Sequence, residues 1–111
     1  MVNAKKKGNA GENEFANWLH EKGVKAYRNS SSGAGMYKGD INNSVDCTFE
    51  IKTVKKINLK DAWYQVNRDA SIAHNMPVLA IRFDGMPKRE WLVVTHSEDW
   101  IEMLKRMHGI K

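Results

Sequence analysis

The sequence holds little that could cross-link the chain or carry it through a membrane. Its 111 residues include one cysteine, Cys47, and two prolines. A lone cysteine cannot form a disulfide within the chain, and Cys47 has no cysteine or histidine near it at metal-site spacing. No apolar run approaches the roughly 20 residues that a membrane-spanning helix needs. We therefore exclude a disulfide scaffold and a membrane span, and we expect Cys47 to be a small core residue in a reduced, intracellular compartment.

Acidic residues are in the minority. Lysine and arginine number 18 against 13 aspartates and glutamates, for a formal charge of +5. A positive field attracts phosphate without reading sequence, so the balance favours a nucleic-acid partner over an uninformative solvated surface. With 41% apolar and 28% charged residues, the composition is that of an ordinary globular chain with one modest core.

The first eight residues carry Lys5, Lys6 and Lys7 with no apolar segment behind them, which does not fit a secretory signal. We interpret residues 1–8 as a flexible basic arm and residues 9–111 as a single domain. The arm either binds phosphate or serves only as a solubilising tail.

Hydrophobic periodicity predicts helices and strands in alternation along the chain. The expected helices run from Ala10 to Lys22, from Leu59 to about His74 with Asn58 as cap, and onward from Ser97, which is expected to cap the last helix. The expected strands are Val24 to Arg28, one beginning at Gly39, Val45 to Thr53, Val78 to Phe83, and Glu90 to Thr95. This order predicts an α/β domain with a mixed sheet flanked by helices.

The last predicted helix is apolar over an arc wider than the roughly 100° stripe that packing on one core requires. The apolar positions are Trp100, Ile101, Met103, Leu104, Met107 and Ile110. A surplus rich in methionine suits a protein interface. Close packing of this helix into the sheet is the equally good alternative.

Three charged residues define a candidate active site. Glu50 and Lys52 lie two apart on a predicted strand, so both project from one face, which also carries Asp46 and Thr48 and is therefore expected to lie outside the dry core. A short turn between strands would bring Asp40 beside Glu50. Two converging carboxylates need a cation between them, and Mg²⁺ accepts such ligands. Lys52 could orient a water bound to the metal or stabilise charge on the phosphate. The alternative is a solvated face with cross-strand ion pairs.

The set Asp40, Glu50 and Lys52 resembles the PD-(D/E)xK nuclease pattern, with Gly39 at the position where a proline often stands. That resemblance implies a restriction-endonuclease-like αβββαβ core, here followed by an extra strand and helix. Within the superfamily the chain is most similar to the archaeal Holliday-junction resolvases, which also occur in phages.

Two further segments carry the resemblance to the resolvases. Lys7-Gly8 followed by Glu12 resembles their N-terminal motif, in which the glutamate is a third acidic group at the metal. Arg28 with Ser32-Gly33 resembles the loop in which a serine acts near the scissile phosphate; Ser30 and Ser31 are alternatives, and the following glycine favours Ser32. Lys55 matches the basic residue that often follows the Glu-x-Lys strand.

The resemblance implies a metal-dependent endonuclease that cuts branched DNA as a homodimer in the cytoplasm of a prokaryote or phage host. The catalytic residues are then Glu12, Ser32, Asp40, Glu50 and Lys52; the ligands of Mg²⁺, or of Mn²⁺ in its place, are Glu12, Asp40 and Glu50; the DNA-binding residues are Lys5, Lys6, Lys7, Arg28, Lys55 and Lys56. Alternatives are a related nuclease for flaps, nicks or duplexes, and a non-catalytic basic DNA-binding module. Gln65, on the helix after the motif, could contact the site, but we expect it to be a surface residue.

Overall fold

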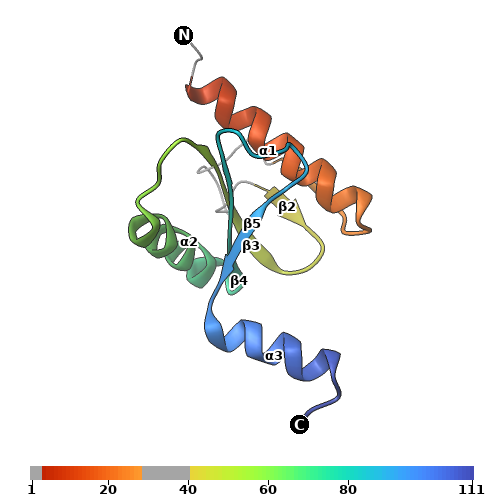
Figure 1. Ribbon diagram of the computed structural model, residues 1–111. Helices are drawn as coiled ribbons and strands as arrows, with labels where there is room; N and C mark the ends of the chain where they lie inside the picture. The colour runs from red at the N-terminus through yellow and green to blue at the C-terminus, as the bar shows by residue number, and fades with distance from the viewer. Residues whose placement is uncertain (1–3, 29–40) are drawn as a thin grey trace.

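A computed structural model describes residues 4–28 and 41–111 (Figure 1). Its elements are α1 (Ala4–Glu21), β1 (Ala26–Arg28), β2 (Ile41–Asn43), β3 (Cys47–Val54), α2 (Leu59–Ala73), β4 (Met76–Phe83), β5 (Leu92–Thr95) and α3 (Ser97–Met107). The predicted order of helices and strands is confirmed. None of the described helices combines the length and apolar character needed to cross a membrane.

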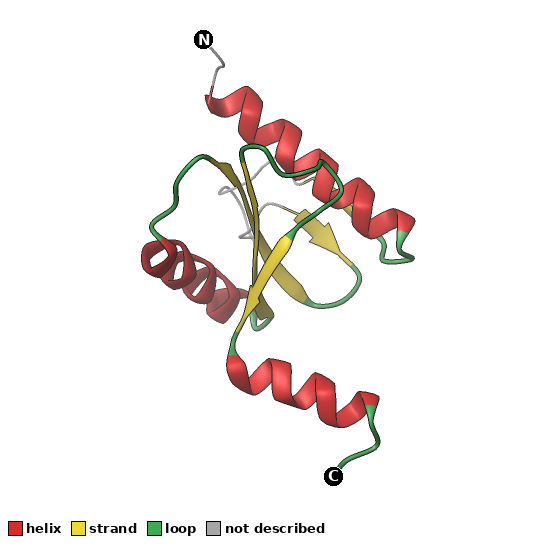
Figure 2. Cartoon of the chain, in the orientation of Figure 1, coloured by secondary structure: helices red, strands yellow, loops and turns green. Residues whose placement is uncertain are grey.

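The sheet is mixed, as predicted. β3 and β4 are parallel, with Glu50 opposite Leu79, and β5 is antiparallel to β4. β1 and β2 form a separate antiparallel pair in which Arg28 lies opposite Ile41. In Figure 2, α1 and α2 lie on opposite sides of the strands. The domain is thus a sheet between two helices, which is the predicted α/β layering.

Each face of the sheet has its own apolar cluster because side chains alternate along a strand. On the α1 face, Phe15 and Leu19 pack against Phe49 and Val78. On the α2 face, the cluster consists of Ala62, Val66, Leu79 and Ile81. The residues from Val78 to Ile81 are all buried, which confirms β4 as a strand covered on both faces.

α1 begins at Ala4, six residues before the expected start at Ala10. The residues from Ala4 to Gly8, which we expected to belong to a flexible arm, are therefore helical. Alanine and lysine favour a helix, and a glycine inside one costs only about 1 kcal/mol. Gly8 and Gly11 therefore weaken the helical periodicity of the sequence without ending the helix. Gly11 has a packing role, since a Cβ there would lie 2.7 Å from Cγ2 of Thr53. The missing side chain lets α1 approach β3.

An ion pair also attaches α1 to the sheet. Arg82 on β4 pairs with Glu14 on α1, and its guanidinium carbon lies 4.5 Å from the ring centroid of Trp91. Trp91 in turn packs edge-on against Phe15. These contacts fix the position of α1, and with it the position of Glu12.

β3 begins at Cys47, so Val45 does not join its core face as expected. Asp46 has a φ of 55°, which reverses the chain just before the strand. The Asn43 side chain holds this turn: its Oδ1 accepts hydrogen bonds from the backbone amides of Val45 and Cys47, and its Nδ2 donates to the Cys47 carbonyl. Val45 is consequently exposed.

α3 does not pack into the sheet, so that alternative for the last helix is wrong. None of its residues is buried, and Figure 1 shows it leading away from the rest of the domain. The predicted cap, Ser97, is the first helical residue instead. The side chain of His96 caps the helix, because its Nδ1 accepts a hydrogen bond from the Glu98 amide at 3.1 Å.

Candidate active site

Glu50 lies at the centre of the candidate site and is 7% exposed, while Thr48 on the same face is 2% exposed. The expectation that this face lies outside the core is therefore wrong. α2 packs across it, with Ala62 and Val66 buried above the sheet. The polar groups under the helix have partners: the Asn75 amide, for example, donates to Thr48 Oγ1 at 3.3 Å.

Lys52 and Gln65 are among the residues whose side chains contact the Glu50 carboxylate. The Nζ of Lys52 lies 3.4 Å from Glu50 Oε1, as their spacing of two residues on β3 predicts. The Nε2 of Gln65 on α2 donates to the same oxygen at 3.5 Å. Gln65 is half-buried rather than a surface residue, so that expectation is wrong. Its place between Ala62 and Val66, at the margin of the core face of α2, was the available signal.

The cap of α2 sets which residues of that helix face β3. Asn58 Oδ1 accepts a hydrogen bond from the Asp61 amide at 3.1 Å, which confirms the predicted start of the helix. A helical residue turns about 100° from its neighbour, so the start fixes Ala62 and Val66 over the sheet and Gln65 toward Glu50.

Glu12 and Arg28 form an ion pair beside this strand. The Nε of Arg28 donates to Glu12 Oε2 at 2.8 Å, and both side chains are partly buried. The pair joins α1 to β1. Because Gly11 contacts Thr53, the backbone at Glu12 lies against the carboxyl-terminal half of β3, the strand that carries Glu50 and Lys52.

Several predicted site residues lie outside the described residues, namely Asp40, Ser30, Ser31 and Ser32. The side chains of Lys5, Lys6 and Lys7 also lie outside the description. Within residues 4–28 and 41–111, no group of three histidine, cysteine or acidic residues is close enough to hold a metal ion. A three-carboxylate centre therefore requires Asp40 and stays a prediction.

Lys55 and Lys56 follow the end of β3 and are both exposed. They are thus free of the core and available to solvent, as phosphate-binding residues must be. Cys47 is half-buried, and burial, followed by the charges of Asp46 and Asp99, raises the pKa of its thiol to about 11. The cysteine is a packing residue with little thiolate character.

The structure has a mixed sheet between helices, and one strand carries a Glu-x-Lys pair with a buried glutamate and a half-buried lysine. These features define the class, because they are those of a PD-(D/E)xK nuclease. The family model described as archaeal Holliday junction resolvase (Hjc) matches residues 3–107. The chain belongs to that family. No curated protein matches it.

Family membership gives the activity in outline. The chain is a Holliday-junction resolvase-like nuclease that uses a divalent metal and acts on branched DNA. This favours a nuclease over a non-catalytic DNA-binding module. It also places the chain where DNA is, inside the cell.

Proposed function

We propose that this chain is a magnesium-dependent endonuclease that cuts junctions by hydrolysis at a centre formed by Glu12, Asp40 and Glu50. The observation that supports the proposal is the burial of Glu50 with Lys52 and Gln65 on the same carboxylate oxygen. A buried carboxylate is costly unless its charge is compensated. Carboxylate oxygens are ligands that Mg²⁺ accepts, and Mn²⁺ is expected to substitute. The residues present therefore fit a divalent ion.

The protein groups around this centre have separate tasks. A bound divalent ion supplies Lewis acidity and lowers the pKa of a coordinated water. Lys52 carries its charge 3.4 Å from Glu50, where it stabilises negative charge that develops on the phosphate. Ser32, by its likeness to the family loop, contacts the DNA near the scissile phosphate. Arg28 pairs with Glu12 at 2.8 Å and so holds this carboxylate in position beside β3.

The DNA-binding surface consists of basic residues at two places. Lys55 and Lys56 extend the site beyond the end of β3, where they are exposed. Lys5 to Lys7 add positive charge near the start of α1, and Arg28 borders the segment that contains the serines. Such contacts bind phosphates of any sequence, which suits an enzyme that recognises branch structure in the cytoplasm of a prokaryotic cell or a phage host.

We also propose that the active form is a homodimer. A four-way junction presents two equivalent strands to be cut, whereas the chain has one Glu-x-Lys site. Symmetric resolution then requires two copies, and a two-fold pair is the commonest arrangement of identical chains.

The test compares cleavage of a four-way junction with cleavage of a duplex of equal length, in Mg²⁺, in Mn²⁺ and in EDTA. Wild type should cut the junction preferentially and only with metal. Asp40→Asn and Glu50→Gln should each reduce the rate by about 10³-fold, the scale of losing about 4 kcal/mol of transition-state stabilisation, and leave binding intact or tighter. Glu90→Gln, at an exposed acid before β5, is the matched control. Wild-type rates in either site variant, or equal cutting of the duplex, would refute the proposal.

A further inference from the structure

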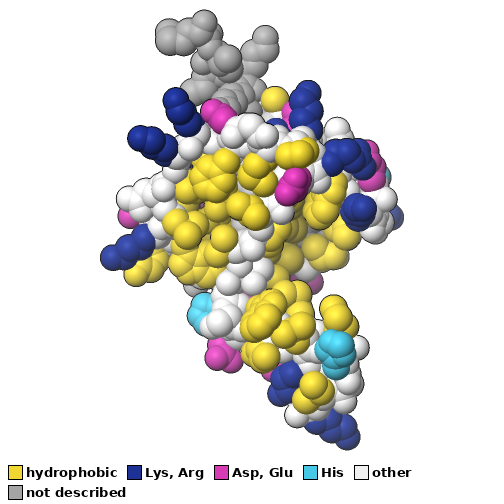
Figure 3. Space-filling view, viewed as in Figure 1, with side chains coloured by type: hydrophobic (Ala, Val, Ile, Leu, Met, Phe, Trp, Pro, Cys, Tyr) yellow, Lys and Arg dark blue, Asp and Glu magenta, His cyan; other side chains and the backbone are white. Residues whose placement is uncertain are grey.

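α3 exposes a set of large apolar side chains that its own domain does not cover. Trp100 is 54% exposed and Met107 is 73% exposed, and Ile101, Met103 and Ile110 are also exposed. Figure 3 shows this apolar area on the same side of the molecule as a second one that spans the middle of the domain. A contiguous exposed apolar area of this kind is typical of an interaction surface.

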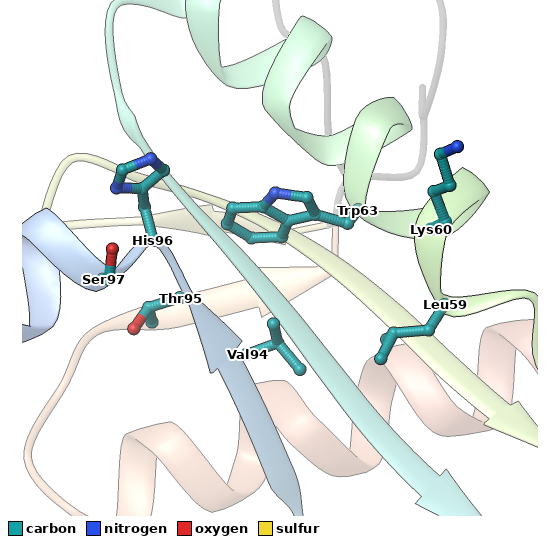
Figure 4. A pocket seen from close by; sticks show the side chains of 7 residues that line it. All are labelled: Leu59, Lys60, Trp63, Val94, Thr95, His96 and Ser97. Carbon is teal, nitrogen blue, oxygen red and sulfur yellow. The ribbon is translucent and has the colours of Figure 1, made fainter.

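A pocket of about 580 Å³ opens between the start of α2 and the end of β5. Its apolar lining comes from Leu59, Trp63 and Val94, and Lys60 and His96 stand at its edge. Figure 4 shows the Trp63 indole between His96 and Lys60, with Leu59 and Val94 pointing into the same space. The exposed Leu92 on β5 lies two residues from Val94 and extends this apolar surface.

The chain cannot fill this pocket with its own α3. The helix begins at Ser97, which itself lines the pocket. Each turn carries the helix about 5.4 Å farther from its start, and Figure 1 shows it pointing away from α2. Met103 and Met107 therefore lie out of reach of Leu59 and Trp63 in the same copy.

We infer that α3 of one copy docks in the α2–β5 pocket of a second copy, and that the second copy returns the contact. The inference rests on the proposed function only in taking the active form to be a dimer. The inference follows from two apolar surfaces on one chain, the exposed side of α3 and the α2–β5 pocket, which cannot reach each other within one copy. A two-fold axis makes each helix available to the other pocket, as a closed interface requires.

The charges on α3 favour a protein over DNA as the occupant. Glu98, Asp99 and Glu102 lie on its first two turns, whereas Lys105 and Arg106 lie in its last turn. The half of the helix that carries Trp100 is therefore acidic, and acidic side chains repel phosphate. The same acids suit Lys60, which stands at the edge of the pocket on the partner. In the dimer, α3 then binds the two copies together and fixes the distance between their active sites.

Light scattering at micromolar concentration, without DNA, tests the interface. Wild type should have the mass of a dimer, and Trp100→Glu should halve it while leaving the thermal unfolding transition cooperative. Ile72→Glu is the matched control, because Ile72 is exposed to a similar extent, 58%, but does not line the pocket. A monomeric wild type, a dimeric Trp100→Glu or a monomeric Ile72→Glu would each overturn the inference.

Cross-linking identifies the contact itself. Copies with Cys47→Ser and Leu59→Cys are mixed with copies carrying Cys47→Ser and Met103→Cys, and a short bismaleimide is added. The mixture should give a covalent heterodimer, at least ten times more than a mixture in which Ile72→Cys replaces Leu59→Cys. Equal yields, or none, would overturn the inference. Neither experiment requires cleavage, so a dimer that fails to cut junctions would refute the proposed function alone.

Discussion

Replacing Gln65 with glutamate tests whether Glu50 faces a cation. The two side chains are isosteric, so the variant places a second carboxylate where the amide nitrogen now lies, 3.5 Å from Glu50 Oε1. Two like charges at that distance repel by about 5 kcal/mol at an effective dielectric constant of about 20. Lys52, 3.4 Å from the same oxygen, and the partial exposure of Gln65 reduce this value. We expect a net loss of about 1–2 kcal/mol in the free energy of unfolding, or about 5–10 °C in Tm for a domain of this size.

The assay is thermal unfolding followed by circular dichroism, first in EDTA and then in MgCl₂. Gln65→Glu should unfold at a lower temperature than wild type in EDTA. Magnesium should restore its Tm, because an ion that binds only the folded state stabilises it. Asn17→Asp is the control: it makes the same change of charge at an exposed position of α1, and its Tm should respond to neither condition.

Two results would refute this reasoning. If Gln65→Glu is as stable in EDTA as Asn17→Asp, the residue at position 65 does not face Glu50. If the variant is destabilised but magnesium has no effect on its Tm, Glu50 does not belong to a cation site. In the second case the buried Glu50 would be a structural ion-pair partner of Lys52.

Three further outcomes are expected. Leu79→Ala, at a residue with no exposure, should lower the free energy of unfolding by about 3 kcal/mol, measured by urea titration; a loss below about 1 kcal/mol would contradict the two-sided core. Burial raises the pKa of the Cys47 thiol to about 11, and only the thiolate reacts with iodoacetamide. At pH 8 the cysteine should therefore react roughly 200-fold more slowly than an unperturbed thiol, and its rate should rise as the pH rises through its pKa. A rate typical of a free thiol would contradict the burial of Cys47. Replacing Lys5, Lys6 and Lys7 with serine should reduce the salt dependence of DNA binding, measured by fluorescence anisotropy, by about one unit of slope for each phosphate that these lysines neutralise in wild type; an unchanged slope would make this segment a solubilising tail.

The order of the helices and strands could be predicted from the sequence because it depends on short-range periodicity. The nearly continuous apolar run from Val78 to Phe83 predicted β4, in which Val78 to Ile81 are indeed buried, and Asn58 predicted the start of α2. The spacing of Glu50 and Lys52 was enough to place both on one face, since the strand repeats every two residues. The likeness to the resolvases rested in addition on the segments around Glu12 and Ser32, and the family match confirmed it.

Errors arose where a local pattern met a contact distant in the sequence. Gly8 and Gly11 weaken the helical pattern, yet the missing side chain of Gly11 is what allows Thr53 on β3 to pack closely against α1. Val45 fits the alternating pattern of β3, but the turn held by the Asn43 side chain makes the strand begin only after Val45, at Cys47.

The burial of Glu50 was decided by tertiary structure alone. A strand face bearing aspartate, threonine, glutamate and lysine is polar by composition, and composition predicts solvent. α2 nonetheless covers it, and the helix supplies Gln65 as a partner for the carboxylate. The pairing of Glu12 with Arg28, 16 residues away, likewise required α1 and β1 to be placed against one another. The sequence by itself determined which side chains share a strand or a helix face, because backbone geometry repeats locally. Which face is covered, and by which charged partner, was determined by packing between elements far apart in the chain, and no local pattern encodes that.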